Sequence, residues 1–154
     1  EREVISEDAY FALEFFSKIS TAVVLPYNFY FYYKRGNSLS RNYNPQRQKK
    51  NDIFLQKSLD YIKKENLPSE VENQLKARYH TLSLVCMKQI VSSDLSKKEK
   101  KAEFKKIFKN EVLRSTLDSE VIKLAIAPSR VFWTLFKLRF YHLCYLLLWI
   151  KADK

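Results

Sequence analysis

From residue 47 onward, apolar residues recur at intervals of three and four, and this spacing predicts helices throughout that part of the chain. Leu55, Leu59 and Ile62 give a first helix one apolar face. A Ser69–Glu72 capping-box pattern should open a long second helix. One side of that helix is predicted to be apolar and consists of Val71, Leu75, Tyr79, Leu82, Cys86 and Ile90.

Two further helices are predicted after this pair. Ser96 with Glu99 repeats the capping-box pattern and indicates a short basic helix. Another helix should run over about 117–127 and stop at Pro128, because the residue before a proline is disfavoured in helices. We therefore expect a mainly α fold with about five helices after residue 46.

The N-terminal part of the chain has a different pattern. Ser6 can cap a helix whose first turn carries Glu7 and Asp8. This helix is apolar on nearly every side and should be buried. The β-branched and aromatic runs 21–25 and 29–33 predict two short strands. Since two strands alone do not make a stable sheet in water, we expect them at the edge of a sheet that other residues supply.

The last segment, 130–151, mixes aromatic residues and leucines with cations. A membrane-spanning helix needs about 20 mainly apolar residues, and two central cations would be costly there. A helix that lies in the membrane interface fits better. Its predicted lipid contacts are Arg130, Trp133, Lys137, Arg139 and Trp149. The alternatives are a core helix and a contact with a partner subunit.

The charge is unevenly distributed. The net charge of +11 arises entirely after residue 46, because basic and acidic groups cancel before it. A basic region of this kind can meet nucleic acid or an anionic membrane surface. A basic helical interaction module is therefore the alternative function, with lysines clustered over 97–106. No groove-reading motif accompanies them, so nucleic acid is not the favoured partner.

Several kinds of site are not expected. Gly36 is the only glycine, which excludes a P-loop and a dinucleotide fingerprint. His80 and His142 lack neighbours at zinc-ligand spacing, and no Asp-X-Asp pair is present to hold a metal ion. We therefore expect neither a metal nor a cofactor within these residues. Cys86 and Cys144 lie in apolar helical patterns and predict two buried free thiols in a reducing cytosol.

The order of elements at the N-terminus has a specific resemblance. Glu7-Asp8, a hydrophobic helix, a short Val-rich strand, an aromatic strand and the basic turn Asn37-Ser38-Leu39-Ser40 follow one another. This order resembles the end of the catalytic domain of family-2 glycosyltransferases. Those are inverting enzymes of the GT-A fold, and the members most like this chain assemble bacterial capsule, exopolysaccharide or lipopolysaccharide. The resemblance covers roughly residues 1–45.

The resemblance implies roles for individual residues. Asp8 would be the general base that takes the proton of the attacking sugar hydroxyl, and Glu7 would shape the acceptor pocket. The basic turn would close over the donor diphosphate and neutralise its charge through Lys34, Arg35, Ser38, Ser40 and Arg41. The residues by themselves also allow an acidic first turn that complements the helix dipole and a solvated basic turn.

The family's nucleotide-binding units and its Asp-X-Asp motif are not among these residues, and the chain begins at Glu1 without Met. We therefore expect the C-terminal part of a larger enzyme, inactive by itself. Its parts would be the acceptor-side end of a GT-A α/β domain over 1–46, a helical bundle over 47–128 and an amphipathic helix over 129–154.

The resemblance also implies partners for the intact enzyme. It would use a nucleotide sugar with Mg²⁺ or Mn²⁺ and transfer the sugar to a glycan or a lipid-linked acceptor. We expect it in the cytoplasm, peripheral on the inner face of the cell membrane. The oligomeric state is left open, a homo-oligomer included.

Overall fold

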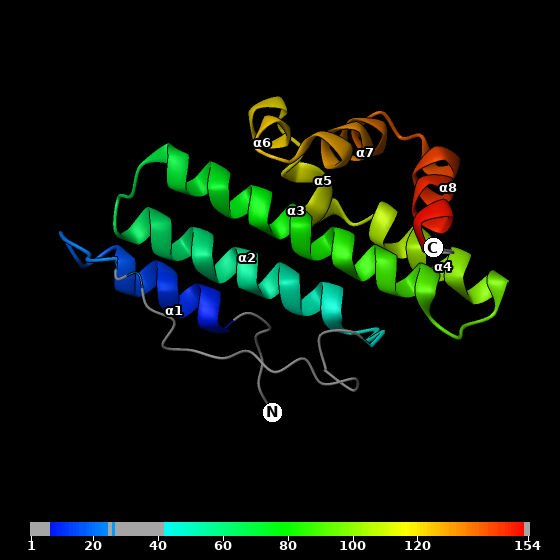
Figure 1. Cartoon of the computed structure of the whole chain (residues 1–154), viewed down its shortest axis with the longest axis horizontal. Coiled ribbons are helices and arrows are strands. Elements are labelled where there is room, and N and C mark those ends of the chain that lie inside the picture. The colour runs from blue at the N-terminus through cyan, green and yellow to red at the C-terminus, as the bar shows by residue number, and fades with distance from the viewer. Residues whose placement is uncertain (1–6, 25, 27–41, 153–154) are drawn as a thin grey trace.

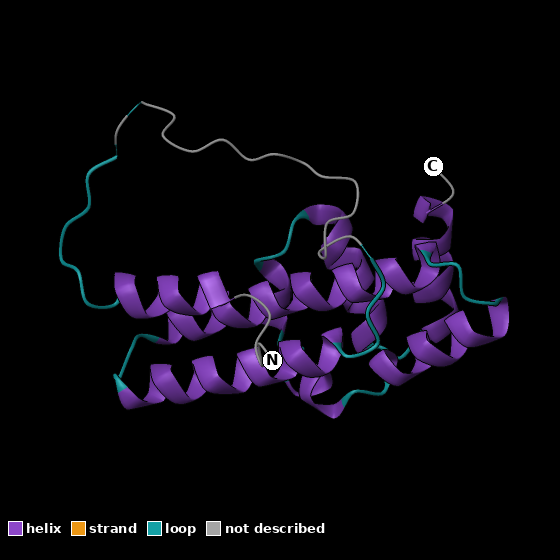
Figure 2. Ribbon diagram, turned by 90° about the horizontal axis from the view of Figure 1, so that it is seen from below, coloured by secondary structure: helices purple, strands orange, loops and turns teal. Residues whose placement is uncertain are grey.

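The computed structural model describes residues 7–24, 26 and 42–152. Within these ranges the regular structure consists of helices, and no strand is formed (Figures 1 and 2). The predicted mainly α fold is therefore confirmed. The helices in chain order are α1 (Glu7–Phe16), α2 (Arg47–Lys64), α3 (Ser69–Ser92), α4 (Lys97–Phe108), α5 (Glu111–Ser115), α6 (Ser119–Lys123), α7 (Ala127–Lys137) and α8 (Tyr141–Ala152).

The long helices α2 and α3 form an antiparallel pair at the centre of the molecule (Figure 1). Helix α1 lies along α2, on the side away from α3. Helices α4, α6 and α8 pack on α3, and α7 packs on both α6 and α8. Helix α3 is therefore the element around which the rest of the fold is built.

One hydrophobic core joins these helices. Tyr79 and Met87 of α3 are fully buried, together with Phe104 of α4 and Phe136 of α7. Cys144 of α8 belongs to the same cluster. Removing such a side chain from water contributes about 1.5–3 kcal/mol. Because residues on both sides of Pro128 share this core, the last two helices are packed on the bundle and do not stand apart from it.

The predicted faces of α2 and α3 are confirmed, since Leu55, Ile62, Tyr79 and Ile90 are all buried. Helix α2 ends at a Schellman motif, in which the N–H of Leu67 donates to the carbonyl of Ile62. Asn66 takes the left-handed conformation there, with φ 50°, because its short polar side chain tolerates this region.

Only one of the two predicted capping boxes is formed. The Ser96 hydroxyl accepts from the N–H of Glu99, and the Glu99 carboxylate accepts from the N–H of Ser96 at 2.9 Å. At the start of α3 the prediction is wrong. Pro68 is the N-cap residue there and makes no side-chain cap bond, so Ser69 already lies inside the first turn.

Two helix boundaries near the C-terminus also differ from the prediction. Helix α6 has only 5 residues, and Pro128 does not end a helix but lies in the first turn of α7. Proline is tolerated there because an N–H in the first turn has no intrahelical partner. In its described part, residues 21–24, the predicted strand over 21–25 is not formed either. Residues 21–24 have no strand pairing, since the described residues offer them no partner strand.

The predicted continuous helix over 129–154 is in fact two helices. The N–H of Phe140 donates to the carbonyl of Leu135, and the N–H of Arg139 donates to that of Phe136. These bonds form a second Schellman motif, with Arg139 in the left-handed region at φ 65°. The chain turns at this point, and α8 folds back onto α3 and α4.

Candidate functional site

Glu7 and Asp8 open α1, as predicted, and the Asp8 side chain is exposed. The predicted cap Ser6 lies outside the described residues. The first turn of a helix presents N–H groups without intrahelical partners and the positive end of the helix dipole. The carboxylate predicted to be the general base therefore lies at an accessible position where negative charge is stabilised.

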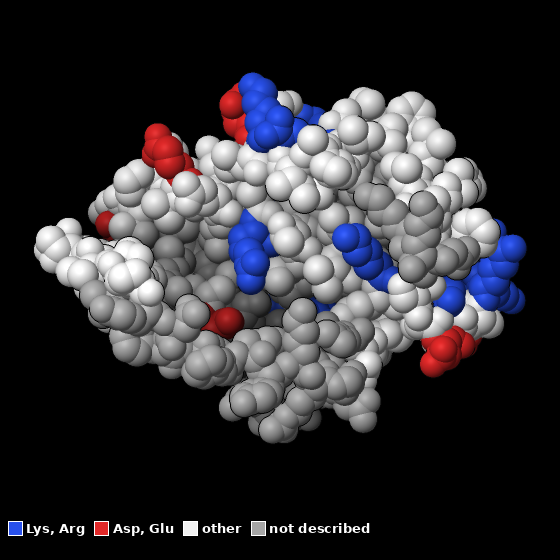
Figure 3. All heavy atoms as spheres, in the orientation of Figure 1, with Lys and Arg blue, Asp and Glu red and all other residues white. Residues whose placement is uncertain are grey.

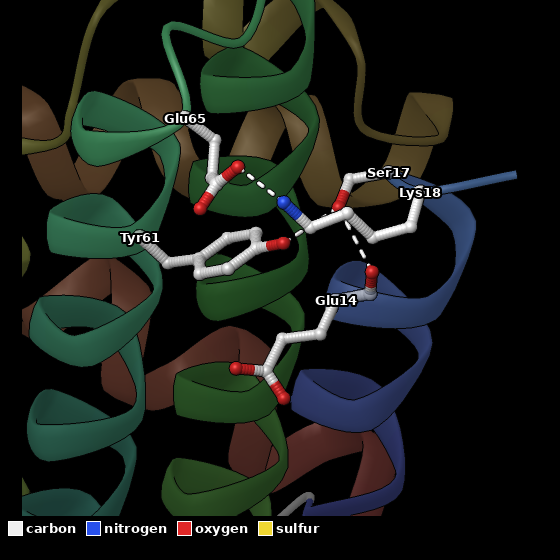
Figure 4. A network of polar contacts seen from close by, with 5 residues as sticks. All are labelled: Glu14, Ser17, Lys18, Tyr61 and Glu65. Carbon is white, nitrogen blue, oxygen red and sulfur yellow. Dashed lines mark hydrogen bonds and ion pairs between the residues drawn. The ribbon is translucent and has the colours of Figure 1, made fainter.

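The opposite end of α1 is joined to α2 by a polar network (Figure 4). The Ser17 hydroxyl donates to the carbonyl of Glu14 at 2.9 Å, so it accepts from the Tyr61 hydroxyl at 2.7 Å. The Lys18 ammonium donates to the Glu65 carboxylate and lies 6.0 Å from the centre of the Tyr61 ring. This pairing raises the pKa of Lys18 and lowers the pKa of Glu65. Helix α1 is thus fixed to the C-terminal end of α2.

The side of α1 that meets α2 consists of Tyr10, Glu14 and Ser17, at helical spacing i, i+4, i+7. The Tyr10 ring packs edge-on against the Tyr61 ring, with centroids 6.2 Å apart. Burial, and after it the charge of Glu14, raises the pKa of Tyr10. The helical spacing of these three polar residues could be seen in the sequence. Only the fold shows that their side of α1 is the one that contacts α2.

The prediction that α1 is buried is wrong for its other side. Phe11 is 65% exposed, and Phe15 and Phe16 are exposed as well. The Phe11 and Phe15 rings stack on one another at 5.9 Å. A helix that is apolar all round needs packing partners on every side. The described part of the chain supplies only α2 on one side, so the phenylalanine side is left bare.

The structure does not place the predicted lid. Lys34, Arg35, Ser38, Ser40 and Arg41 all lie outside the described residues, as does the second predicted strand over 29–33. The position of this turn relative to Asp8 therefore stays a prediction.

Four of the five predicted lipid contacts are exposed, namely Arg130, Lys137, Arg139 and Trp149. The prediction for Trp133 is wrong, because its side chain is only 1% exposed. Trp133 lies on the same side of α7 as Phe132 and Phe136, and this side faces the core.

A partly buried polar cluster was not predicted from the sequence. The Asp52 carboxylate of α2 accepts from the Tyr79 hydroxyl at 2.5 Å, from the Gln48 amide at 2.8 Å and from the Asn110 amide at 2.8 Å. Burial, followed by this carboxylate, raises the pKa of Tyr79. The cluster ties α2 to α3 and to the N-cap of α5. In the sequence, Gln48 and Asp52 stand at spacing i, i+4. This spacing could have indicated the bond between these two side chains, but not their contacts with Tyr79 and Asn110.

Asp52 and Gln48 also line a hollow of about 190 Å³ between α2, α3 and α4. Tyr43 closes one side of this hollow, and burial, followed by the charge of Glu103, raises the pKa of Tyr43 to about 12. Most of the polar groups named around the hollow bond to one another, as in a structural cluster, but Oε1 of Gln48 is buried without a hydrogen-bond partner among the described residues.

The two thiols behave as predicted. Cys86 and Cys144 are free and buried. Burial raises the pKa of the Cys86 thiol to about 11 and that of the Cys144 thiol to about 12. Both are therefore protonated and unreactive at neutral pH.

Among the residues with described positions, no group of three or more His, Cys, Asp or Glu side chains could hold a metal ion. In the same ranges no helix is long and apolar enough to cross a membrane. Comparisons with family models, curated proteins and solved structures give no match. The glycosyltransferase resemblance therefore rests on the residues quoted from the sequence.

Proposed function

We propose that this chain is the acceptor-side and C-terminal part of an inverting glycosyltransferase, and that Asp8 is its general base. The observation that carries the proposal is the exposed Asp8 carboxylate on the first turn of α1, within the Glu7-Asp8 motif. The order of elements that follows this motif in the sequence supports the same assignment. The acceptor would be a glycan or a lipid-linked sugar, reached from the cytoplasmic side of the membrane.

The chemistry assigns one proton transfer to this chain. The Asp8 carboxylate takes the proton of the acceptor hydroxyl while its oxygen attacks the anomeric carbon of the donor sugar. The bond between that carbon and the diphosphate oxygen breaks, the nucleotide diphosphate leaves with the electron pair, and the configuration inverts. Glu7 would shape the acceptor pocket, and the cations and hydroxyls of the 34–41 turn would face the leaving diphosphate.

A divalent ion would neutralise part of the diphosphate charge in the intact enzyme. The described residues offer no group of three or more ligands for it. Both the ion and the nucleotide sugar are assigned to a donor-binding half that residues 1–154 do not contain.

The bare side of α1 supports this division of roles. Phe11, Phe15 and Phe16 form an exposed aromatic surface on the helix that carries Asp8. Contiguous apolar surfaces of this kind mark interaction sites, contacts with other protein among them. We assign this surface to the donor-binding half, which would place the donor sugar next to the start of α1.

The test is Asp8→Asn in the enzyme that joins this chain to its donor-binding half. Loss of the base should lower the rate of sugar transfer by about 10²–10⁴-fold. Binding of the nucleotide sugar, measured by calorimetry, should stay nearly unchanged, because the substitution keeps the size of the side chain. Asp94→Asn, an exposed carboxylate between α3 and α4, is the matched control and should keep full activity. A wild-type rate in Asp8→Asn would exclude Asp8 as the base.

A further inference from the structure

Helix α8 has two apolar sides, and only one of them is covered. Tyr141, Cys144, Tyr145 and Leu148 face α3, α4 and α7 and contribute to the core. On the opposite side, one stripe at spacing i, i+3, i+7, i+10 is made of residues that are 37–49% exposed, namely Phe140, Leu143, Leu147 and Ile150. A surface helix usually carries polar residues on its outer side. The outer stripe of α8 therefore needs a separate explanation.

The apolar surface continues from α8 onto α7. Val131 and Leu147 line one hollow between α3, α7 and α8, and Val131 is exposed, as is Leu138 at the end of α7. In Figure 3 the described atoms over α7 and α8 are mainly white, and none of them belongs to an acidic side chain. Single exposed apolar residues are common, whereas a contiguous patch marks an interaction site. We call this patch, made of Val131, Leu138, Phe140, Leu143, Leu147 and Ile150, the outer surface.

The described charged residues of α7 and of the turn that follows it are all cations. Between Val121 and Ala152 the sequence contains lysines and arginines but no aspartate or glutamate. Arg130, Lys137 and Arg139 are exposed. In a symmetric dimer formed through this surface, the cations of one copy would face those of the other, which is unfavourable. The partner that fits is therefore apolar at its centre and anionic at its rim.

The turn between α7 and α8 provides an independent observation. Arg139 takes a left-handed conformation at φ 65° between the exposed residues Leu138 and Phe140. A glycine would take this conformation without steric cost, whereas arginine does so under strain. Backbone strain of this kind is typical of sites with a function. Its effect here is to present a cation between two apolar side chains at the tip of the helical hairpin.

We propose that the outer surface binds the anionic surface of a lipid membrane. Helix α8 would lie in the plane of the interface with its outer stripe at the boundary between headgroups and acyl chains. Lys137 and Arg139 would meet lipid phosphates, and the half-exposed Trp149 would lie at headgroup depth. This assignment retains Lys137, Arg139 and Trp149 of the contacts predicted from the sequence and excludes the buried Trp133. It is independent of the sugar-transfer proposal.

The experiment is vesicle flotation of the 154-residue chain. Vesicles of phosphatidylcholine with an equal part of phosphatidylglycerol are compared with vesicles of phosphatidylcholine alone. The unaltered chain should float only with the anionic vesicles. The double variant Leu143→Ser/Leu147→Ser tests the stripe, and Lys137→Glu/Arg139→Glu tests the cations. Each variant should lower binding by roughly tenfold or more.

Two controls match these changes. Val112→Ser removes an exposed apolar side chain from α5, outside the outer surface. Lys63→Glu/Lys64→Glu makes the same change in charge at the C-terminal end of α2, which lies far from α8 in Figure 1. Both controls should float like the unaltered chain, and circular dichroism should show the same helix content in every variant.

Two results would overturn the proposal. One is equal flotation with and without phosphatidylglycerol, or binding that survives the reversal of both cations. The other is a dimer in sedimentation experiments that Leu143→Ser/Leu147→Ser converts to monomer, with no vesicle binding by the unaltered chain. That result would assign the outer surface to a second copy of the chain.

Discussion

The imidazole of His80 lies against the indole of Trp133, with ring centroids 4.8 Å apart, and this contact joins α3 to α7. The Thr116 hydroxyl donates to the carbonyl of Leu113 at 2.8 Å, so it accepts from Nε2 of His80 at 3.0 Å. The Nδ1 atom of His80 is buried and has no hydrogen-bond partner among the residues with described positions. Burial therefore lowers the pKa of His80 to about 4.

This depressed pKa predicts a loss of stability in mild acid. The unfolded chain protonates His80 near its usual pKa of 6.5, whereas the folded chain does so only near pH 4. The contribution of His80 is therefore fully present above pH 6.5 and is lost as the pH falls toward 4. The free energy of unfolding in urea should drop by about 2 kcal/mol between pH 7 and pH 5 from this group. His80→Gln should remove this component, and the exposed His142→Gln should retain it.

The two tryptophans should differ strongly in their effect on stability. Trp133→Ala removes a side chain that is 1% exposed and should lower the free energy of unfolding by about 3–5 kcal/mol. Trp149→Ala removes a side chain that is 50% exposed and should cost about 1 kcal/mol or less. Denaturant unfolding of both variants gives the comparison. Equal costs would mean that Trp133 is not the core residue described here.

The two serines that resemble helix caps should also differ. Ser96→Ala removes the capping box at the start of α4 and should cost about 1 kcal/mol. Ser69→Ala should change the free energy of unfolding by less than about 0.5 kcal/mol, because Pro68 is the cap position of α3 and has no side-chain cap bond. Thermal unfolding of both variants, monitored by circular dichroism at one pH, is sufficient to compare their stability. A similar loss in both variants would be evidence against the single cap.

Relief of strain at Arg139 should stabilise the chain. Arg139→Gly removes a side chain from a residue at φ 65° and should raise the free energy of unfolding by about 0.5–1 kcal/mol. Asn66→Gly, at φ 50°, should give a smaller gain because asparagine tolerates this conformation better. Urea unfolding measures the free energy of unfolding of both variants. If Arg139→Gly destabilises the chain, the arginine side chain makes a stabilising contact that outweighs the strain.

Sequence periodicity was sufficient where a helix has one apolar side. For α2 it identified both the helix and the residues that meet the core, because Leu55 lies on a face whose opposite side is polar. For α3 it identified the helix and its Tyr79 side, but His80, Met87 and Val91 are buried as well, on a second side that the periodicity did not indicate. It also placed Glu7 and Asp8 at the first turn of α1. Residues 34–41 lie outside the described residues. Of the proposed site, the structure therefore shows only the position of the α1 residues.

Tertiary structure decided the cases in which a helix is apolar on more than one side. In α1, α7 and α8 the spacing allows several buried faces, and only the position of α2 or α3 determines that Tyr10, Trp133 and Cys144 point inward. The same holds for the break at Arg139, where no glycine or proline marks the end of α7. Periodicity records which residues share a face, whereas burial depends on which neighbours that face meets, and those neighbours are distant in the sequence.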